Sequence, residues 1–553
     1  MPTKQKSKKK LKSKSKKKGK AAAPQISKKE LAARKRQRAK QIQEVIGALV
    51  TYGGLGAVIG ITLFFVADPK IALAGGGGVA VLALSFKYPM LGLWGFMIYM
   101  PFAGTVTYWI GGGSPIFQLA KDGFYIPAII AVGLWCKKTG NPFIIPKAMK
   151  NPLYFLLGLC LITLIFVNGA RQFNPPPPRP GVVLNQSKKP DQFIAQGILG
   201  LKVMLGYVPL ITGAYYKLKS KRELLFAARL TVILAIICCL LGMVQYQFLA
   251  SGKCNGTRGF TGDQLFKATL EAKCLIGGAL LFSPSQGVIR LPGTFVAPWQ
   301  WGWFLISNAA FTFAVAFCDP SPVWRIAGLF GMAVVFVNAA ISGQRIALAL
   351  VPTVTIILLV LTGQVANLKR FLPIGIGLGV VLGGVIVSNP AVVQERIDSF
   401  VSRWQASPPT AFIAQQFEES SHGQDGVFGN GVGRATNSTR VFAKTRLIET
   451  YYPKLMYEIG PIGAIAMLVL LTSVTVAGFK AYRSVKDKNL RSLGASYWVF
   501  VMIISYNTYY YPLDVDPVAV YYWYFAGVVM RLPEIDKQEQ ARIKAEEEME
   551  NSK

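Results

Sequence analysis

The residues with the clearest capacity for chemistry lie in a polar segment that ends at a hydrophobic run. Glu449 comes directly before that run, and Arg434, Arg440 and Arg446 precede it at six-residue intervals. A carboxylate can deprotonate or orient a hydroxyl group, and guanidinium groups hold phosphate oxygens through a fork of N–H donors. This combination indicates chemistry on a polar, anionic substrate. The alternative for Glu449 is structural, because an acid before a helix is favoured by the helix dipole.

Two further arginines stand at the edges of apolar runs. Arg290 opens the segment 290–295, and Arg345 ends a turn at 342–345 that joins two apolar runs with almost no loop. For Arg290 we consider an anion clamp or an interfacial arginine beside tryptophans. An ionisable group near the apolar region costs roughly 2–3 kcal/mol on insertion scales, so Arg345 is a functional candidate by default. A bond from Arg345 to nearby backbone carbonyls is its structural alternative.

A glycine-rich segment, 428–434, lies within the same polar region. Its alternating glycines could let backbone amides approach a phosphate group. No strand precedes it and no Lys-Ser/Thr pair ends it, so it is not a nucleotide-binding loop. We predict that Gly431 and Gly433 contribute to substrate binding, together with Tyr452 and one or two of the three arginines that follow the glycines.

Membrane helices must position these residues. The 553-residue chain is 52% hydrophobic and only 16% charged, and its apolar runs of roughly 17–25 residues can cross ~30 Å of hydrocarbon. Backbone groups in lipid must be satisfied within the segment, so the runs should be helical. We therefore predict an all-α polytopic membrane protein with about 12–14 transmembrane helices and a large outer-face loop that contains short helices. The candidate spans are 44–67, 70–87, 89–109, 122–137, 152–168, 194–217, 223–249, 297–318, 323–341, 345–362, 369–388, 456–479, 491–508 and 515–531.

The basic residues of the short loops orient the chain, because cytoplasmic loops carry an excess of Lys and Arg. With both termini cytoplasmic, the loops 137–151, 216–224, 363–370 and 480–491 are all inside and basic. The expected organisation is a disordered basic tail (1–43), N-terminal transmembrane helices (44–250), an outer loop (251–296), transmembrane helices (297–388), a large outer loop (389–455), C-terminal transmembrane helices (456–531) and a charged cytoplasmic tail (532–553).

The formal net charge of +35 does not indicate a nucleic-acid-binding protein. About half of the excess lies in residues 1–40, which hold 18 Lys and Arg residues, one acid and no aromatic residue to stack on bases. Such a tail is typical of a segment that lies against anionic lipid, and we expect no nucleic-acid partner.

The cysteines and the single histidine restrict metal and redox chemistry. Cys254 and Cys274 flank one polar loop, and a disulfide between them is plausible if that loop lies outside the cytoplasm. The other five cysteines lie in apolar runs. His422 is the only histidine, so we expect no histidine-based metal site, and its Ser/Gly/Asp-rich surroundings are typical of a solvated loop. We expect neither a metal nor a cofactor.

Taken together, these positions resemble the O-antigen ligase and O-antigen polymerase superfamily of bacterial membrane glycosyltransferases over roughly 285–470. The residues that carry the resemblance are, in chain order, Arg290, Gly293, Thr294, Phe295 and Pro298; Gln344 and Arg345; the segment 395–404; Gly429, Gly431 and Gly433; and Gly460 and Gly463. Counting back from the last two glycines places Glu449 and Thr450 on the family's His-Asn pair. Glu449 thus replaces the histidine typical of ligases, and a carboxylate there is more similar to polymerase-type members.

The resemblance implies a metal-independent glycosyltransferase at the outer face of the bacterial plasma (inner) membrane. Its donor would be a polyprenyl-pyrophosphate-linked glycan, and its acceptor a glycan or a lipid. Arg290 and Arg345 would hold the pyrophosphate, and Glu449 would act on the acceptor hydroxyl. Two other classes stay open: a transporter of an anionic or polar solute, and a structural or assembly protein.

Overall fold

The computed structural model describes residues 28–174, 190–261, 273–278, 280–283, 288–364, 408–424 and 426–551, with the single residues 394, 398, 401, 402 and 405. Ten helices in these ranges are long and apolar enough to cross a membrane, and α14 is a shorter apolar helix. The protein is therefore an all-α polytopic membrane protein, as its sequence predicts.

The first half of the chain forms membrane-length helices, several of which change pitch along their length. Its elements are α1 (Lys28–Val66), α2 (Pro69–Lys87), α3 (Pro89–Tyr99), η1 (Met100–Phe102), α4 (Ala103–Thr105), η2 (Val106–Ile110), α5 (Pro115–Thr139), η3 (Lys147–Met149), α6 (Lys150–Ile162), η4 (Thr163–Asn168), α7 (Gly169–Phe173), α8 (Phe193–Leu205), α9 (Leu210–Lys217) and α10 (Lys221–Ala250). Each span predicted in this half coincides with one of these helices or with a continuous run of them.

The second half adds a short hairpin and the centre of the bundle. Its elements are β1 (Leu281–Ser283), β2 (Val288–Arg290), α12 (Pro298–Cys318), α13 (Pro322–Ile341), α14 (Arg345–Leu361), α17 (Pro409–His422), η8 (Asn437–Val441), α18 (Tyr451–Ser484), α19 (Lys488–Tyr506), η9 (Pro512–Asp514) and α20 (Val518–Asn551). The predicted span 369–388 lies outside the described residues. The short helices α17 and η8 occupy the large loop, where short helices were predicted.

The core of the bundle surrounds α12 and the first half of α20. Helix α12 packs against α10, α13, α14 and α19 and is buried over nearly its whole length. Aromatic rings join it to α20, with the ring centroids of Phe311 and Phe525 only 4.2 Å apart. Lipid gives little hydrophobic drive for helix association, so close packing of this kind must hold the helices together.

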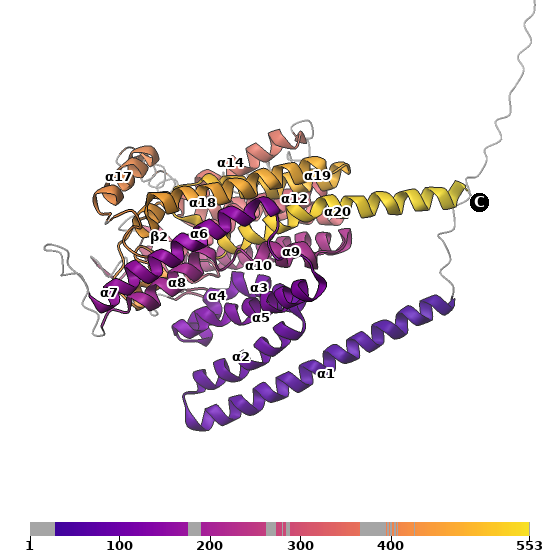
Figure 1. Ribbon diagram of the computed structural model, residues 1–553, viewed down its shortest axis with the longest axis horizontal. Coiled ribbons are helices and arrows are strands. Elements are labelled where there is room, and N and C mark those ends of the chain that lie inside the picture. Colours follow the sequence, from indigo (N-terminus) through magenta and orange to yellow (C-terminus); the bar gives the residue numbers. More distant parts are fainter. Residues whose placement is uncertain are drawn as a thin grey trace, which may run out of the picture.

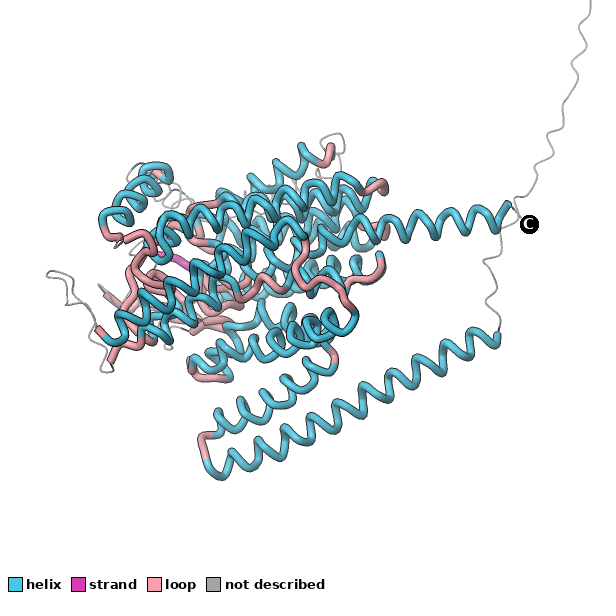
Figure 2. Tube along the Cα trace, viewed as in Figure 1, coloured by secondary structure: helices cyan, strands magenta, loops and turns pink. Residues whose placement is uncertain are grey.

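The molecule has two distinct ends. Figure 1 shows the start of α1 and the end of α20 at one end of the long axis, here called the terminal end, and β2, α7 and α17 at the other. Loops gather at that opposite end, here called the loop end (Figure 2). The start of α1 and the end of α20 thus lie on the same side of the bundle.

One boundary differs from its prediction. Residues 1–43 were expected to form a disordered tail, but α1 already begins at Lys28. The segment 28–43 is rich in Lys, Arg, Ala and Gln, which are good helix formers. Because it continues an existing membrane helix, this segment needs no separate nucleation step.

Candidate functional site

Arg290 and Arg345 are brought together by a β-hairpin and a helix–helix turn. Arg290 ends strand β2, and the next residue, Leu291, donates its N–H to the Ser342 carbonyl at 3.0 Å. Gly343 has φ +69°, and a Cβ at this position would overlap the backbone of β2. Only glycine allows this approach without strain. The turn between α13 and α14 therefore lies on the hairpin, and it carries Arg345 as the first residue of α14.

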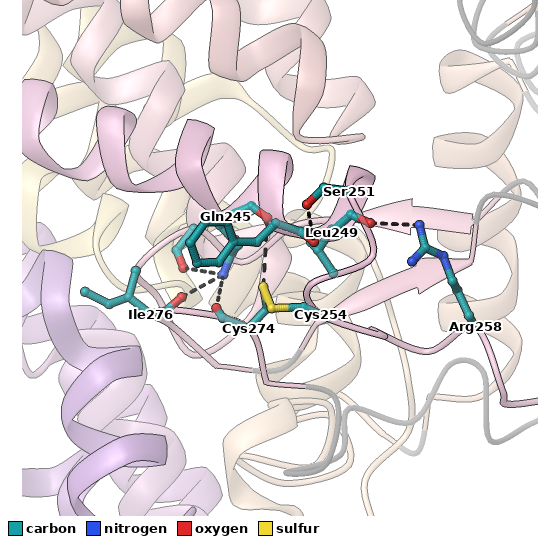
Figure 3. The surroundings of a disulfide bond; sticks show 9 residues. Gln245, Leu249, Ser251, Cys254, Arg258, Cys274 and Ile276 are labelled. Carbon is teal, nitrogen blue, oxygen red and sulfur yellow. Dashed lines mark hydrogen bonds between the residues drawn. A yellow bond between two sulfur atoms is a disulfide. The ribbon is translucent and has the colours of Figure 1, made fainter.

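A disulfide and one glutamine side chain fix the segments on either side of the hairpin. Cys254 and Cys274 are joined by a disulfide bond, the pairing that the sequence suggests. Beside it, the Gln245 side chain of α10 donates to the carbonyls of Cys274 at 3.1 Å and Ile276 at 2.6 Å (Figure 3). The same amide lies 3.3 Å from the Gly293 carbonyl, three residues after Arg290. These bonds position the arginine-bearing strand against α10.

Glu449 is held by backbone bonds from two directions. Its N–H donates to the Gln416 side-chain oxygen in α17 at 3.0 Å, and its carbonyl accepts the Tyr510 N–H at 2.9 Å. The next residue, Thr450, forms an antiparallel bridge with Tyr509. The segment before α18 thus pairs with the loop between α19 and α20, and this pairing holds the half-buried Glu449 at the loop end.

Electrostatic interactions connect four of these side chains. Burial raises the pKa of the Glu449 carboxyl above its ordinary value, and the charge of Arg290 lowers it in part. Burial, with smaller contributions from Tyr510 and Glu449, raises the pKa of Tyr509 to about 12, and Arg345 opposes this shift. We call Arg290, Arg345, Glu449 and Tyr509 the loop-end cluster.

The chemical capacity of the loop-end cluster follows from its groups. Two guanidinium groups supply N–H donors for phosphate oxygens. A carboxylate with a raised pKa is a better base for a hydroxyl group than an ordinary surface carboxylate. The phenol of Tyr509 stays protonated at neutral pH and can donate a hydrogen bond. Tyr509 was not found from the sequence, because its position beside Glu449 depends on the pairing of two distant loops.

Two of the three arginines between the glycines and Glu449 serve the loop itself. The Arg434 guanidinium donates to the Lys444 carbonyl at 3.2 Å and lies 5.1 Å from the centre of the Phe193 ring. Arg446 donates to the Glu419 carbonyl in the last turn of α17 at 3.2 Å, where a cation favours the helix end. Of the three, Arg440 alone, on η8, is exposed.

The glycine-rich segment supports a broken helix. Helix α18 has non-helical backbone angles at Gly460, with φ +76° and ψ 172°. Across this break, the N–H of Asn430 donates to the Tyr457 carbonyl at 2.7 Å, and that of Gly431 to the Glu458 carbonyl at 3.0 Å. These amides are occupied by protein carbonyls, so the structure gives no support to a phosphate-binding role for Gly431.

Gly433 and Tyr452 also make contacts that join elements of the fold. Gly433 has φ +82°, and a Cβ there would overlap the Gln196 carbonyl of α8. The Tyr452 hydroxyl donates to the Ser505 carbonyl of α19. The observed contacts of both residues are therefore structural.

A buried ion-pair group lies one to two turns into α18 and was not singled out from the sequence. The Lys454 ammonium group bonds the Asp514 carboxylate and lies 3.7 Å from Glu458 Oε2. Glu458 Oε1 accepts the N–H of Ala435 at 2.7 Å and the hydroxyl of Thr436 at 3.0 Å. The only signal in the sequence was the spacing of Lys454 and Glu458, four residues apart in an apolar helix.

A second set of ion pairs holds the other side of the loop between α19 and α20. Lys121 of α5 pairs with Asp516 at 2.6 Å, and Lys202 of α8 pairs with Asp122 at 2.9 Å. The loop that carries Tyr509 is therefore fixed by the buried Lys454–Asp514 salt bridge on one side and the partly buried Lys121–Asp516 salt bridge on the other. Removal of one partner of a buried ion pair strongly destabilises a protein, because the other charge is left without compensation. These pairs should therefore hold the loop in place.

Comparison with known proteins adds no family to this description. No protein-family model matches the chain, and no curated protein matches it. In the described part of the chain, no group of three or more His, Cys, Asp or Glu side chains could hold a metal ion. The segment 395–404, one element of the sequence resemblance, lies mostly outside the described residues.

Proposed function

We propose that this protein is a membrane-embedded glycosyltransferase that moves a glycan from a polyprenyl pyrophosphate to an acceptor hydroxyl. The observation that carries the proposal is the convergence of Arg290, Arg345, Glu449 and Tyr509 at the loop end. The four residues come from four distant parts of the chain. Their chemistry suits a lipid-linked pyrophosphate at the membrane surface, where phosphate groups and lipid tails meet.

The proposed reaction is a single displacement. The acceptor oxygen forms a bond to the anomeric carbon, while the bond from that carbon to the pyrophosphate oxygen breaks. The leaving pyrophosphate takes the electron pair, and Arg290 and Arg345 stabilise its negative charge. Glu449 accepts the proton of the acceptor hydroxyl, and Tyr509 donates a hydrogen bond to the phosphate or the acceptor. Lipid-linked glycan and acceptor give elongated glycan and free lipid pyrophosphate.

We further propose that the loop end faces the outside of a bacterial plasma membrane and that both termini are cytoplasmic. The disulfide between Cys254 and Cys274 supports this orientation, because disulfides persist in oxidising compartments and are rare in the cytosol. The basic loops of the terminal end support it as well. The resemblance to O-antigen ligases and polymerases agrees with the same orientation.

A glycan profile of the cell envelope tests the proposal. A strain that lacks the gene is complemented with the wild type or with the Arg290→Ala variant at equal membrane abundance. We expect a lost or shortened polymer that only the wild type restores, and the type of defect separates polymerisation from ligation. An unchanged profile in the strain that lacks the gene would reject the transferase.

A second candidate function is the transport of an anionic or polar solute. It is favoured by the break at Gly460 in α18, which lies next to the buried Lys454 and Glu458. Interrupted helices and intramembrane charges are typical of substrate sites in transporters. Accumulation of solute in vesicles that contain the wild-type protein, and not in vesicles that lack it, would favour transport over transfer.

A further inference from the structure

A cavity of about 620 Å³ opens at the terminal end, far from the loop-end cluster along the bundle. Its walls come from the end of α5, the α9 helix, the segment 141–147 and the part of α20 near Arg531. Helices α9 and α20 pack against each other, and Figure 1 shows α9 on the side of the bundle from which α20 extends to the terminal end. The cavity contributes nothing to the proposed transferase chemistry, so its composition requires a separate explanation.

An aromatic wall forms one side of the cavity. The ring centroids of Trp135 and Tyr216 are 5.1 Å apart, and those of Tyr215 and Tyr216 are also 5.1 Å apart, both in edge-to-face geometry. The Tyr216 hydroxyl donates to the Pro142 carbonyl at 2.8 Å, which ties the wall to the segment after α5. Trp and Tyr are enriched where membrane helices meet the headgroup region. The wall thus places the cavity at headgroup level.

Arg531 lines the cavity, and neighbouring groups hold its guanidinium in position. Its Nε donates to the Leu218 carbonyl at 3.1 Å, and its guanidinium lies 5.1 Å from the centre of the Tyr215 ring. One terminal nitrogen bonds the Glu534 carboxylate, and the Tyr215 hydroxyl bonds the other oxygen of that carboxylate. Glu534 is therefore satisfied by its neighbours, and it orients the guanidinium more than it repels an anion.

The rim of the cavity is basic. Lys147 and Lys219 line it and are exposed, and within the described ranges neither ammonium group has a carboxylate partner within 4 Å. Lys217 stands next to them, with its ammonium group 5.5 Å from the centre of the Trp135 ring. Two lysines and one arginine thus line a cavity whose single carboxylate is already paired, and Lys217 lies beside its aromatic wall. This excess of positive charge favours an anionic ligand.

The part of α5 that precedes the cavity carries exposed apolar side chains on one face. Ile126, Ile130 and Leu134 recur on one face of this helix and are 45%, 51% and 54% exposed. Trp135 of the cavity wall follows directly. A ligand with a phosphate at headgroup level and an acyl chain along α5 would cover both surfaces, whereas a soluble anion would use only the polar one.

We propose that this cavity binds the phosphate group of an anionic phospholipid in the leaflet on the terminal side. Lys147 and Lys219 contact the phosphate oxygens, the fixed Arg531 offers its remaining N–H donors, and the aromatic wall covers the glycerol region. Basic pockets between membrane helices bind lipid headgroups through the same combination of charge and depth. The site does not depend on the proposed transferase activity.

Native mass spectrometry of the purified full-length chain in detergent tests the site, with phosphatidylglycerol as the probe. In the Lys147→Gln/Lys219→Gln variant, we expect the first phosphatidylglycerol to bind roughly 30-fold more weakly than to the wild type, since each basic side chain near the phosphate contributes a factor of about five. The Lys480→Gln/Lys488→Gln variant is the matched control, because it loses the same charge from exposed positions of the terminal end outside the cavity. This control should bind like the wild type, and all three proteins should share one unfolding midpoint.

Three results would overturn the proposal. Equal affinity of the wild type and the Lys147→Gln/Lys219→Gln variant for phosphatidylglycerol would show that these lysines do not bind the lipid phosphate. Equally tight binding of phosphatidylcholine would show that headgroup charge plays no part. Displacement of phosphatidylglycerol by an equal concentration of inorganic phosphate would assign the cavity to a soluble anion instead of a lipid.

Discussion

Glu449 and Glu458 lie nine residues apart on one continuous segment, yet their surroundings are opposite. Glu458 is fully buried, and it is bound by the N–H of Ala435, the hydroxyl of Thr436 and the charge of Lys454. Glu449 is half-buried, and within the described residues its carboxylate has no hydrogen bond or ion pair with the protein. The charge of Arg290 acts on it and lowers its pKa against the effect of burial.

The arginines near the loop end also differ in whether groups of the protein bind them. Arg434 and Arg446 donate to backbone carbonyls and stack on aromatic rings, so they stabilise the large loop. Arg290 is exposed at the end of a strand and makes no ion pair in the part of the chain that the structure describes. Residue type alone does not separate a structural charge from a reactive one. The separation depends on whether protein groups already satisfy the side chain.

The largest effect is expected when the cation is removed from the buried ion-pair group of Lys454, Asp514 and Glu458. Lys454→Met leaves Asp514 and Glu458 buried without a positive partner, and breaking a buried ion pair costs ~3–5 kcal/mol. We expect a lower unfolding midpoint in purified membranes and reduced abundance. If Lys454→Met matched Lys253→Met, a change of an exposed lysine at the loop end, the buried group would not be structural.

The next effect concerns the two arginines of the loop-end cluster. Arg290→Ala and Arg345→Ala should each lower transfer by ~10²–10³-fold, the usual loss when one donor to a developing charge is removed. Lysine at either position should restore part of the activity, since it keeps the charge but not the fork of donors.

Arg222→Ala provides the control for these arginine variants, because Arg222 is exposed at the terminal end. Its transfer activity should equal that of the wild type, and the unfolding midpoints of all the arginine variants should agree. Wild-type transfer activity in the Arg290→Ala variant would show that this arginine takes no part in the reaction.

A smaller effect is expected for the glycine-rich segment. Gly433→Ala forces a Cβ into the Gln196 carbonyl at φ +82°, whereas Gly426 has φ +71° and open space around it. A strained backbone position of this kind costs ~1–3 kcal/mol, so Gly426→Ala carries the strain but not the overlap. The unfolding midpoint should fall further in Gly433→Ala, and equal midpoints would contradict the close packing of the segment on α8.

The sequence predicts the fold better than it predicts the site. Thirteen of the fourteen predicted spans coincide with helices, because the length of an apolar run is set by the membrane. The loop-end position of Arg290, Arg345 and Glu449 follows from counting spans. The Lys454–Asp514 pair and Tyr509 depend on contacts between distant loops, and no spacing along the chain reports those contacts.

The glycine-rich segment shows a different limit of the sequence. Alternating glycines indicate that the backbone approaches something closely, but not what it approaches. In this protein the neighbour is the broken helix α18 and the helix α8, both parts of the same chain. A sequence pattern for close approach therefore becomes evidence for a ligand only when the amides have no protein acceptor.

The smallest expected effect is a shift in pH dependence. As a base, Glu449 must be ionised, so kcat/KM should rise with pH through its pKa, which burial raises above the ordinary carboxyl range. The Arg290 charge lowers that pKa, so Arg290→Gln should move the acidic limb of the residual activity to higher pH, while Arg290→Lys should leave it nearly in place. An acidic limb that moved to lower pH in Arg290→Gln would contradict the interaction between Arg290 and Glu449.

The Glu449→Gln variant tests most directly whether Glu449 acts as the base in glycan transfer. Transfer and unfolding are measured on the same preparation. Burial raises the folded-state pKa of Glu449, so the folded protein is favoured by the uncharged form below the ordinary carboxyl pKa and loses this advantage as pH rises through the raised value. At neutral pH, Glu449→Gln should therefore be at least as stable as the wild type and should have lost glycan transfer. Full transfer activity in a folded Glu449→Gln protein would show that Glu449 is not the base.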